Sequence, residues 1–445
     1  MFRTIKNAFK TPEVRKKLLY TLLLIVIFRF GCYITAPGVN ASELAEQMKN
    51  VTSGGFTALI DTISGGAFSN LSIFAMSITP YITSSIVIQL LGMIIPSLQA
   101  LIKEGGELGK QKVNKYTKML TIVLAAIEGA GIYISYSNSY SNVFINPGFF
   151  TGLLFVVSLM AGTAILMWLG EQITNKGIGN GISIIIFVGI IAGLPSAITA
   201  LRNIIFTTSG FSTAGLATAI AILVGALLLV TAVVWVQSAE RRIPVQYAKK
   251  VVGRKMYGGQ NTHIPLKLAM AGVMPIIFAS SLLTFPAMVI SIFASDSIGG
   301  TGFLAGLYKF SVATSSASGI EWQYLLANAV VYLVLIVAFT FFYTLATFNP
   351  AEVSQNIKQN GGFIPGIRAG KPTTDYLKSV LMKLTWFGSI FLGIIAILPI
   401  LLSYSGLNIS FGGTSILIVV GVALETVQQL ESQLVMRHYK GFLEK

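Results

Sequence analysis

Residues 18–36 read LLYTLLLIVIFRFGCYITA, and this run of mostly apolar side chains decides the class of the protein. A helix rises about 1.5 Å per residue, so roughly 20 such residues cross the hydrocarbon core of a bilayer. A basic stretch precedes the run, as in a secretory signal, but the run is longer than the apolar part of such a signal, and Pro37 follows the small residue Ala36. We therefore interpret 18–36 as a retained first transmembrane helix.

The same length test finds further apolar runs along the whole chain. The ten predicted spans are 18–36, 73–96, 117–136, 151–171, 182–201, 215–238, 268–293, 324–347, 380–402 and 411–432. Composition agrees, because 54% of the residues are hydrophobic, only 11% are charged, and the mean hydropathy is +0.75. The sequence therefore predicts an all-α integral membrane protein with ten transmembrane helices.

The segments between the predicted spans differ in charge. The chain has 31 Lys and Arg against 16 Asp and Glu, and loops that stay in the cytoplasm are enriched in Lys and Arg. If the amino terminus is cytoplasmic, all but four of these basic residues fall in cytoplasmic segments, the exceptions being Arg29, Lys49, Arg202 and Lys309. The pattern predicts that both termini are cytoplasmic.

Ten spans divide at the loop 202–214 into an amino-terminal half, residues 1–201, and a carboxyl-terminal half, residues 202–445. Five spans per half give the two halves opposite orientations, and inverted halves of transport proteins commonly enclose the transport pathway. The two halves show no convincing sequence similarity, so the inverted repeat stays a hypothesis.

One apolar segment, FTALIDTIS at Phe56–Ser64, is too short to cross the membrane. Glycine pairs flank it on both sides, and glycine reaches backbone angles that other residues avoid. Irregular backbone at membrane depth is tolerated where it is covered by protein or lines a cavity, which favours a re-entrant half-helix beside a pore. The alternative is an amphipathic loop helix on the surface.

Intramembrane catalysis requires a nucleophile with its base, or metal ligands, at membrane depth. The two histidines, His263 and His438, lie in a predicted cytoplasmic loop and in the carboxyl-terminal segment, and the single cysteine, Cys32, suits packing. We therefore predict no enzyme activity, no metal and no cofactor. The remaining alternative is an ion-coupled secondary transporter that uses Glu128, the one clearly mid-span acid.

Six long motifs in colinear order identify the family that the chain resembles. They are SITPYITSSIVIQLL at 77–91, NKGIGNGISIIIFVGIIAGLP at 175–195, RRIPVQYAKK at 241–250, AGVMPIIFASSLLTFP at 271–286, NPAEVSQNIKQNGGFIPGIRAGKPT at 349–373 and FGGTSILIVVGVALE at 411–425. Together they resemble the SecY/Sec61-alpha family of protein-conducting channels over essentially the whole chain. The resemblance implies a central pore between two inverted five-helix halves, in the cytoplasmic membrane of a bacterium.

The resemblance also implies a closed channel sealed at two levels. The first is a ring of apolar side chains at the waist of the pore, formed by Ile78, Ile82, Ile182, Ile186, Ile277 and Ile418. The first four form two pairs spaced by four residues, so each pair shares one helix face. The second is a plug formed by Phe56, Thr57, Ala58, Leu59, Ile60, Asp61, Thr62, Ile63 and Ser64.

Spans two and three, facing spans seven and eight, resemble a lateral gate through which a signal sequence leaves the pore for lipid. Its polar side chains are Thr83, Ser84, Ser85, Gln89, Ser280, Ser281 and Thr284. We expect these groups to make the seam between the helices easier to open than an apolar one, while packing and interhelical hydrogen bonds are the alternative role.

The segments 240–267 and 348–378 resemble cytoplasmic docking loops for the ribosome and the SecA motor ATPase. The expected contact residues are Arg241, Arg242, Lys249, Lys250, Arg254, Lys255 and Arg368. Ribosomal RNA is polyanionic, which gives basic loops an electrostatic reason to be there. The family further implies SecE and SecG as partner subunits, a secretory polypeptide with a signal sequence as substrate, and contacts with membrane lipids, including anionic lipids.

Overall fold

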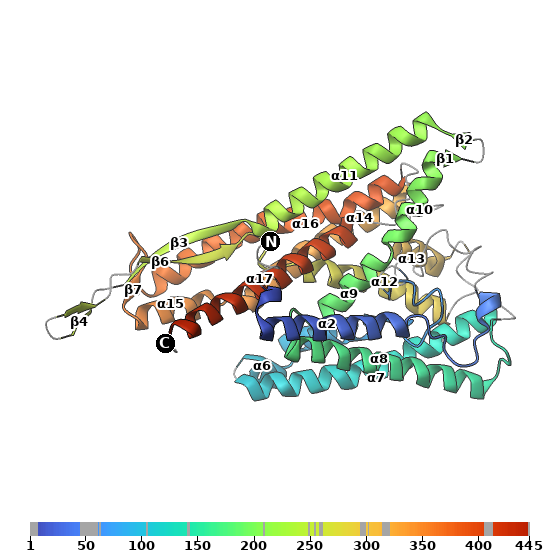
Figure 1. Ribbon diagram of the computed structural model, residues 1–445, viewed down its shortest axis with the longest axis horizontal. Coiled ribbons are helices and arrows are strands. Elements are labelled where there is room, and N and C mark those ends of the chain that lie inside the picture. The colour runs from blue at the N-terminus through green and yellow to red at the C-terminus, as the bar shows by residue number, and fades with distance from the viewer. Residues whose placement is uncertain are drawn as a thin grey trace.

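The computed structural model describes residues 8–44, 61, 64–103, 106–139, 143–207, 210–247, 250–252, 255–257, 261–293, 300, 302–313, 321–404 and 413–443. Figure 1 shows an elongated bundle of helices, from one end of which a β-hairpin projects. The helices are α2 (Pro12–Gly31), α5 (Thr79–Ile94), α6 (Pro96–Lys103), α7 (Gly106–Ser139), α8 (Phe149–Lys176), α9 (Gly181–Ala192), α10 (Leu194–Ile205), α11 (Thr213–Ser238), α12 (Met274–Phe293), α13 (Phe303–Val312), α14 (Trp322–Thr347), α15 (Pro350–Gln359), α16 (Lys371–Tyr404) and α17 (Gly413–Leu443).

The all-α membrane class predicted from the sequence is confirmed. Among the described residues, seven helices are long and apolar enough to cross a membrane, and the bent pair α5 and α6 makes an eighth if it is counted as one span. The predicted spans 18–36 and 268–293 fall on α2 and α12. Each predicted span overlaps helical structure, with 182–201 divided between α9 and α10 at Gly193.

The second predicted span, 73–96, differs most from its helix. The chain forms successive turns before Thr79, and two residues there, Leu71 and Ser77, have positive φ angles of 38° and 51°. Such angles are uncommon for residues with a Cβ, so apolar composition gave no sign of this irregular stretch. At its other end α5 stops before Pro96, and α6 leaves at an angle of 109°.

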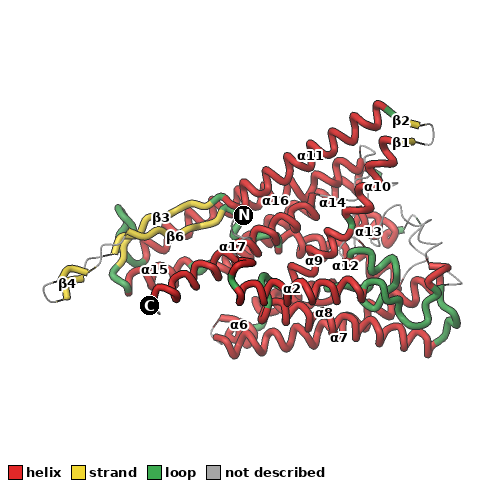
Figure 2. The backbone as a smooth tube through the Cα atoms, viewed as in Figure 1, coloured by secondary structure: helices red, strands yellow, loops and turns green. Residues whose placement is uncertain are grey.

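The segment 240–267, predicted as a loop, is largely a β-hairpin (Figure 2). Strands β3 (Glu240–Tyr247) and β6 (Asn261–Lys267) pair antiparallel, with Ile243 opposite Ile264, and β7 (Gly362–Phe363) adds to the other edge of β3. Two short strands, β4 (Lys250–Val252) and β5 (Lys255–Tyr257), pair with each other further out, and β1 (Phe206–Thr207) pairs with β2 (Gly210–Phe211) elsewhere. Ile243 and Val245 alternate along β3 and pack into an apolar cluster with α15 and α16, which attaches the hairpin to the bundle.

The largest buried apolar cluster lies where α5, α9, α12 and α17 meet. Of these helices, α5 and α9 belong to the predicted amino-terminal half and α12 and α17 to the carboxyl-terminal half. The halves contact each other there, since α9 contacts α17 and α12 contacts both α5 and α7. The side chains of the predicted pore ring therefore lie in one apolar cluster to which helices of both predicted halves contribute.

Candidate functional site

The six isoleucines of the predicted pore ring belong to one cluster. Ile78 is the residue preceding α5, Ile82 lies on α5, and the others lie on α9, α12 and α17. Ile78 and Ile418 are only 2% and 7% exposed, and Ile82 and Ile186 are also buried. Ile182 and Ile277 are partly buried and pack against the same cluster.

Local hydrogen bonds set the positions of the ring side chains. The Ile82 amide donates to the Ile78 carbonyl at 3.0 Å, so the two side chains stand one turn apart at the start of α5. On α9 the Asn180 side chain accepts from the Ile182 amide at 3.2 Å, which fixes the first turn of that helix. Ile182 leans toward α8, because a Cβ on Gly170 would lie 3.2 Å from its Cγ1 atom.

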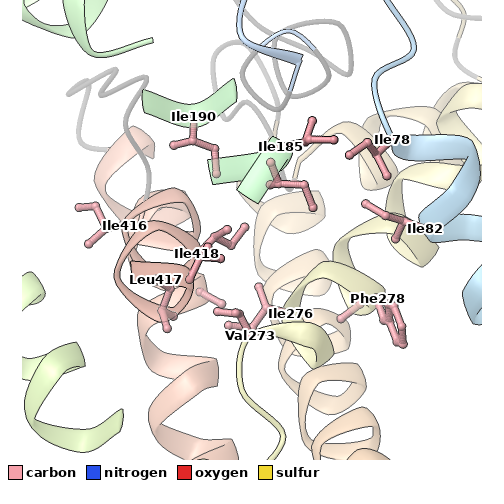
Figure 3. Close-up of a cluster of buried hydrophobic side chains, with 14 of the residues drawn as sticks. Ile78, Ile82, Ile185, Ile190, Val273, Ile276, Phe278, Ile416, Leu417 and Ile418 are labelled. Atoms are coloured by element: carbon pink, nitrogen blue, oxygen red, sulfur yellow. The ribbon is translucent and has the colours of Figure 1, made fainter. Parts of the chain in front are cut away.

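Several buried neighbours were missed by sequence reasoning. Ile185 and Ile190 on α9 are each 1% exposed, and they lie in the same cluster as Ile78, Ile82 and Ile418 in Figure 3. The figure also shows Ile276 and Phe278 of α12, Val273 just before that helix, and Ile416 and Leu417 of α17. Residues 184–186 are all isoleucine, so the sequence alone could not show which of them faces the predicted pore and which packs against other helices.

Of the predicted plug, Phe56–Ile60, Thr62 and Ile63 lie outside the described residues. The described members, Asp61 and Ser64, form a compact turn. The Ser64 hydroxyl donates to the Asp61 carbonyl at 3.1 Å and accepts from the Phe68 amide at 3.2 Å. The Asp61 carboxylate accepts from the Ser69 amide at 2.7 Å. These bonds define the carboxyl-terminal end of the segment as a structured turn.

The polar side chains of the predicted lateral gate lie on α5 and α12, which contact each other. Their described hydrogen bonds stay within their own helices: Thr83 to Thr79, Ser84 to Pro80, Gln89 to Ser85, Ser280 and Ser281 to Ile277, and Thr284 to Ser280 and Ser281. One polar contact crosses the seam, since the Gln89 side chain of α5 lies close to the Tyr343 hydroxyl of α14.

Glu128 lies on α7 and is 7% exposed. The next residue, Gly129, packs against α8, where a Cβ at this position would lie 3.6 Å from Leu159 Cδ1. No ion pair to Glu128 occurs among the described residues, and the same residues contain no cluster of three acids, histidines or cysteines that could bind a metal. Glu128 is thus a buried acid beside a residue that packs against α8.

The predicted docking residues lie on the projecting hairpin and on the loop that follows β7. Arg241 and Arg242 are exposed at the base of β3, where Arg242 forms an ion pair of 2.7 Å with Glu240. Lys250 and Lys255 lie on β4 and β5, whereas Lys249 and Arg254 lie outside the described residues. Arg368 is exposed in the loop between β7 and α16.

Comparisons with known proteins give the family of this chain. A family model described as SecY matches residues 72–427. The protein translocase subunit SecY of Streptomyces scabiei is 46% identical over 457 residues, with 100% of each chain covered.

Two solved structures share the fold. A SecY protein whose plug domain is described as stabilising the closed state of the translocation channel and maintaining a membrane seal has a TM-score of 0.62 at 19% identity, covering 94% of this chain and 91% of that one. Sec61 in the canine ribosome-channel complex from the endoplasmic reticulum has a TM-score of 0.61 at 17% identity, with the same coverage. The family match, the full-length relative and the shared fold together place this chain in the SecY family.

Proposed function

We propose that this chain is the channel-forming subunit of a protein translocase, which passes unfolded secretory polypeptides across the membrane and releases membrane-protein segments sideways into the lipid. The observation that carries the proposal is the apolar cluster at the predicted waist, to which α5, α9, α12 and α17 contribute isoleucine side chains. An apolar constriction gates by dewetting and makes no lasting bonds to a passing chain, so it suits a substrate of any sequence. The alternative, an ion-coupled transporter using Glu128, finds no support in the family or in the surroundings of that residue.

The plug role of Phe56–Ser64 is part of the proposal. The membrane seal ascribed to the plug domain of the similar SecY structure supports it. The structured turn at Asp61 and Ser64 would give such a plug a fixed base beside the waist.

The lateral gate is proposed along the seam between α5 and α7 on one side and α12 and α14 on the other. The hydroxyl groups of this seam already have partners within their own helices, so parting the helices leaves no hydroxyl of this set newly unsatisfied. The Gln89–Tyr343 contact is then a polar link that opening must break.

The energy source is proposed to be a bound partner, either the SecA motor ATPase or the ribosome. The exposed basic groups on the hairpin and at Arg368 suit that contact, and the canine Sec61 channel of the same fold was solved in a ribosome complex. We further propose SecE and SecG as partner subunits, contacts with anionic lipids, the bacterial cytoplasmic membrane as the location, and both termini on the cytoplasmic side, as the basic residues indicate.

A photocrosslinking experiment tests the central claim. A photoreactive residue at Ile82 or Ile277 should crosslink to a stalled secretory chain in membranes that contain the complete translocase. The matched control is Ile390, which is 47% exposed on α16 and is expected to face lipid. Crosslinking of equal strength at all three positions, or at Ile390 alone, would refute a pathway through the waist.

A further inference from the structure

Arg29 is the charged side chain inside the first predicted span, and the structure gives it a specific partner. Its Nη1 atom donates a hydrogen bond of 2.8 Å to the main-chain carbonyl oxygen of Gly65. Its guanidinium also lies 5.7 Å from the centroid of the Tyr33 ring. A charge within a membrane span is costly and is usually placed against a particular group. Here that group is the backbone just beyond the predicted plug.

Gly65 is enclosed from a second side by α9. A Cβ at Gly65 would lie 2.7 Å from Arg29 Nη1 and 2.8 Å from the Gly189 carbonyl oxygen, so no side chain fits between α2 and α9 at this point. Gly65 also has a positive φ of 66°, which favours glycine. Gly189 lies three residues after Ile186, so the helix that closes on Gly65 is also a helix of the waist.

Two further contacts hold the residues that come just before Gly65. The Cys32 thiol of the α2 carboxyl-terminal end lies 3.9 Å from the Ser64 carbonyl oxygen. The Gly66 amide donates to the Asp61 carbonyl at 3.0 Å, which closes the turn on its other side. Holding Gly65 therefore also holds Asp61 and Ser64, the last residues of the predicted plug.

From this geometry we propose that Arg29 is a latch that holds the carboxyl-terminal base of the plug against α2 and α9 in the closed channel. The inference rests on the proposed sealing role of the plug. When α9 moves outward with the waist, Gly189 withdraws from Gly65, and the Arg29 hydrogen bond, with the weaker Cys32 thiol contact beside it, keeps the base of the plug in place. Release of that bond frees Gly65 and the residues bonded to its turn, Asp61 and Ser64.

The test uses the full chain, reconstituted with its partner subunits in planar bilayers, and measures resting ion conductance. Replacing Arg29 by Met keeps a long side chain but removes the donor. We expect the resting open fraction to rise on the order of tenfold or more, since a hydrogen bond to a charged group shifts an equilibrium by about that factor. Arg29→Lys, which keeps a charged donor, should restore part of the seal.

A second pair of variants tests the latch from the other side. Gly65→Ala forces a methyl group against Arg29 and Gly189, whereas Gly66→Ala adds the same group at φ of 87° in open space. Both positions have a positive φ that strains a residue with a Cβ, but only at Gly65 does the added methyl group meet neighbouring atoms. Gly65→Ala should leak more than Gly66→Ala, and this comparison decides the matter if Arg29→Met fails to assemble.

Deletion of residues 56–60 separates a latch from a general packing role. The deletion removes the plug but spares Asp61 and Ser64. If Arg29 acts through the plug, Arg29→Met should add no further conductance to the deleted channel. If Arg29→Met raises the resting conductance equally in channels with and without residues 56–60, the latch is refuted. The latch is also refuted if the deletion raises the conductance but neither Arg29→Met nor Gly65→Ala does. If the deletion itself leaves the channel tight, the sealing role fails and the latch fails with it.

Discussion

The hydroxyl of Thr373 donates a hydrogen bond of 2.8 Å to the main-chain carbonyl oxygen of Arg368. A second hydroxyl, that of Ser354 on α15, donates at 2.9 Å to the Gly370 carbonyl oxygen two residues later. The backbone of this loop is thus fastened to α15 and α16, while the Arg368 side chain is exposed. A preorganised backbone that presents a free guanidinium is suited to a specific contact with a partner.

Arg368→Glu is predicted to stop motor-driven export while the protein still inserts and assembles. The guanidinium presents its donors in a planar fork, so Arg368→Lys should restore only part of the activity. The measurement is export of a secretory precursor into reconstituted vesicles with SecA and ATP. The control is Lys110→Glu, a charge reversal at an exposed position of α7 outside both docking segments. Export within about twofold of wild type for Arg368→Glu would remove Arg368 from the docking site.

Ile418→Asn is predicted to make the resting channel leak and to let it accept substrates with defective signal sequences. A buried amide without partners costs roughly 1–3 kcal/mol, and water entering the waist relieves that cost. Because 1.4 kcal/mol corresponds to about tenfold, the resting open fraction should rise roughly five- to a hundredfold. Ile418→Leu should have a milder effect.

The control for the waist is Ile395 of α16, which is 3% exposed and therefore as buried as Ile418. Ile395→Asn introduces the same amide into the same apolar cluster but outside the proposed ring. It should lower stability without the gain of function. Equal leakage from the two asparagine variants at matched expression would show that the ring is misassigned.

Deletion of Phe56–Ser64 is predicted to leave a folded channel that conducts ions at rest. The structure refines this prediction, because Asp61 and Ser64 accept hydrogen bonds from the amides of Ser69 and Phe68. The shorter deletion of residues 56–60 spares these bonds and should leak with less loss of stability. Conductance in planar bilayers and thermal unfolding of the purified complex measure the two effects. A tight channel after either deletion contradicts the sealing role.

Gln89→Leu is predicted to ease opening of the lateral gate, because it removes the polar contact between α5 and the Tyr343 hydroxyl of α14. Interhelical hydrogen bonds in membranes are worth about 0.6 kcal/mol on average, so export of a precursor with a weakened signal sequence should rise about threefold. Tyr343→Phe should act alike, since it keeps the ring contact with Phe278 at 5.2 Å.

Ser84→Ala is the matched control for the gate, because the Ser84 hydroxyl bonds only to the Pro80 carbonyl of its own helix at 2.7 Å. It should leave the signal-sequence requirement unchanged. A change in Ser84→Ala as large as in Gln89→Leu would mean that general loosening of α5, rather than the link across the seam, controls opening.

The length of apolar runs was enough to predict the helical membrane class, since the cost of unpaired backbone in lipid leaves few alternatives for such segments. The same rule could not predict where α5 begins. Leu71 and Ser77 take positive φ angles that depend on their tertiary surroundings rather than on residue type. The hairpin was also missed, although the alternation of Ile243 and Val245 was present in RRIPVQYA.

For the site, the family resemblance was necessary and is confirmed by the SecY family match. Isoleucine is a common lipid-facing and packing residue in membrane helices, so composition alone cannot distinguish Ile186 from Ile185. Both are buried in one cluster, and which of them meets the pathway remains a prediction about the ring. The contact between Arg29 and Gly65 joins residues far apart in sequence, and no local pattern announces it.

The hydroxyl groups of α5 and α12 form hydrogen bonds within their own helices, so they contribute little to the free energy that keeps the proposed lateral gate closed. With those groups satisfied before and after opening, the parted faces exchange contacts with each other for contacts with acyl chains, because hydrocarbon is no worse a neighbour than a leucine side chain. How well the chains fill the exposed surface then sets much of the opening cost. We therefore expect bilayer fluidity and acyl-chain length to influence which signal sequences the channel admits.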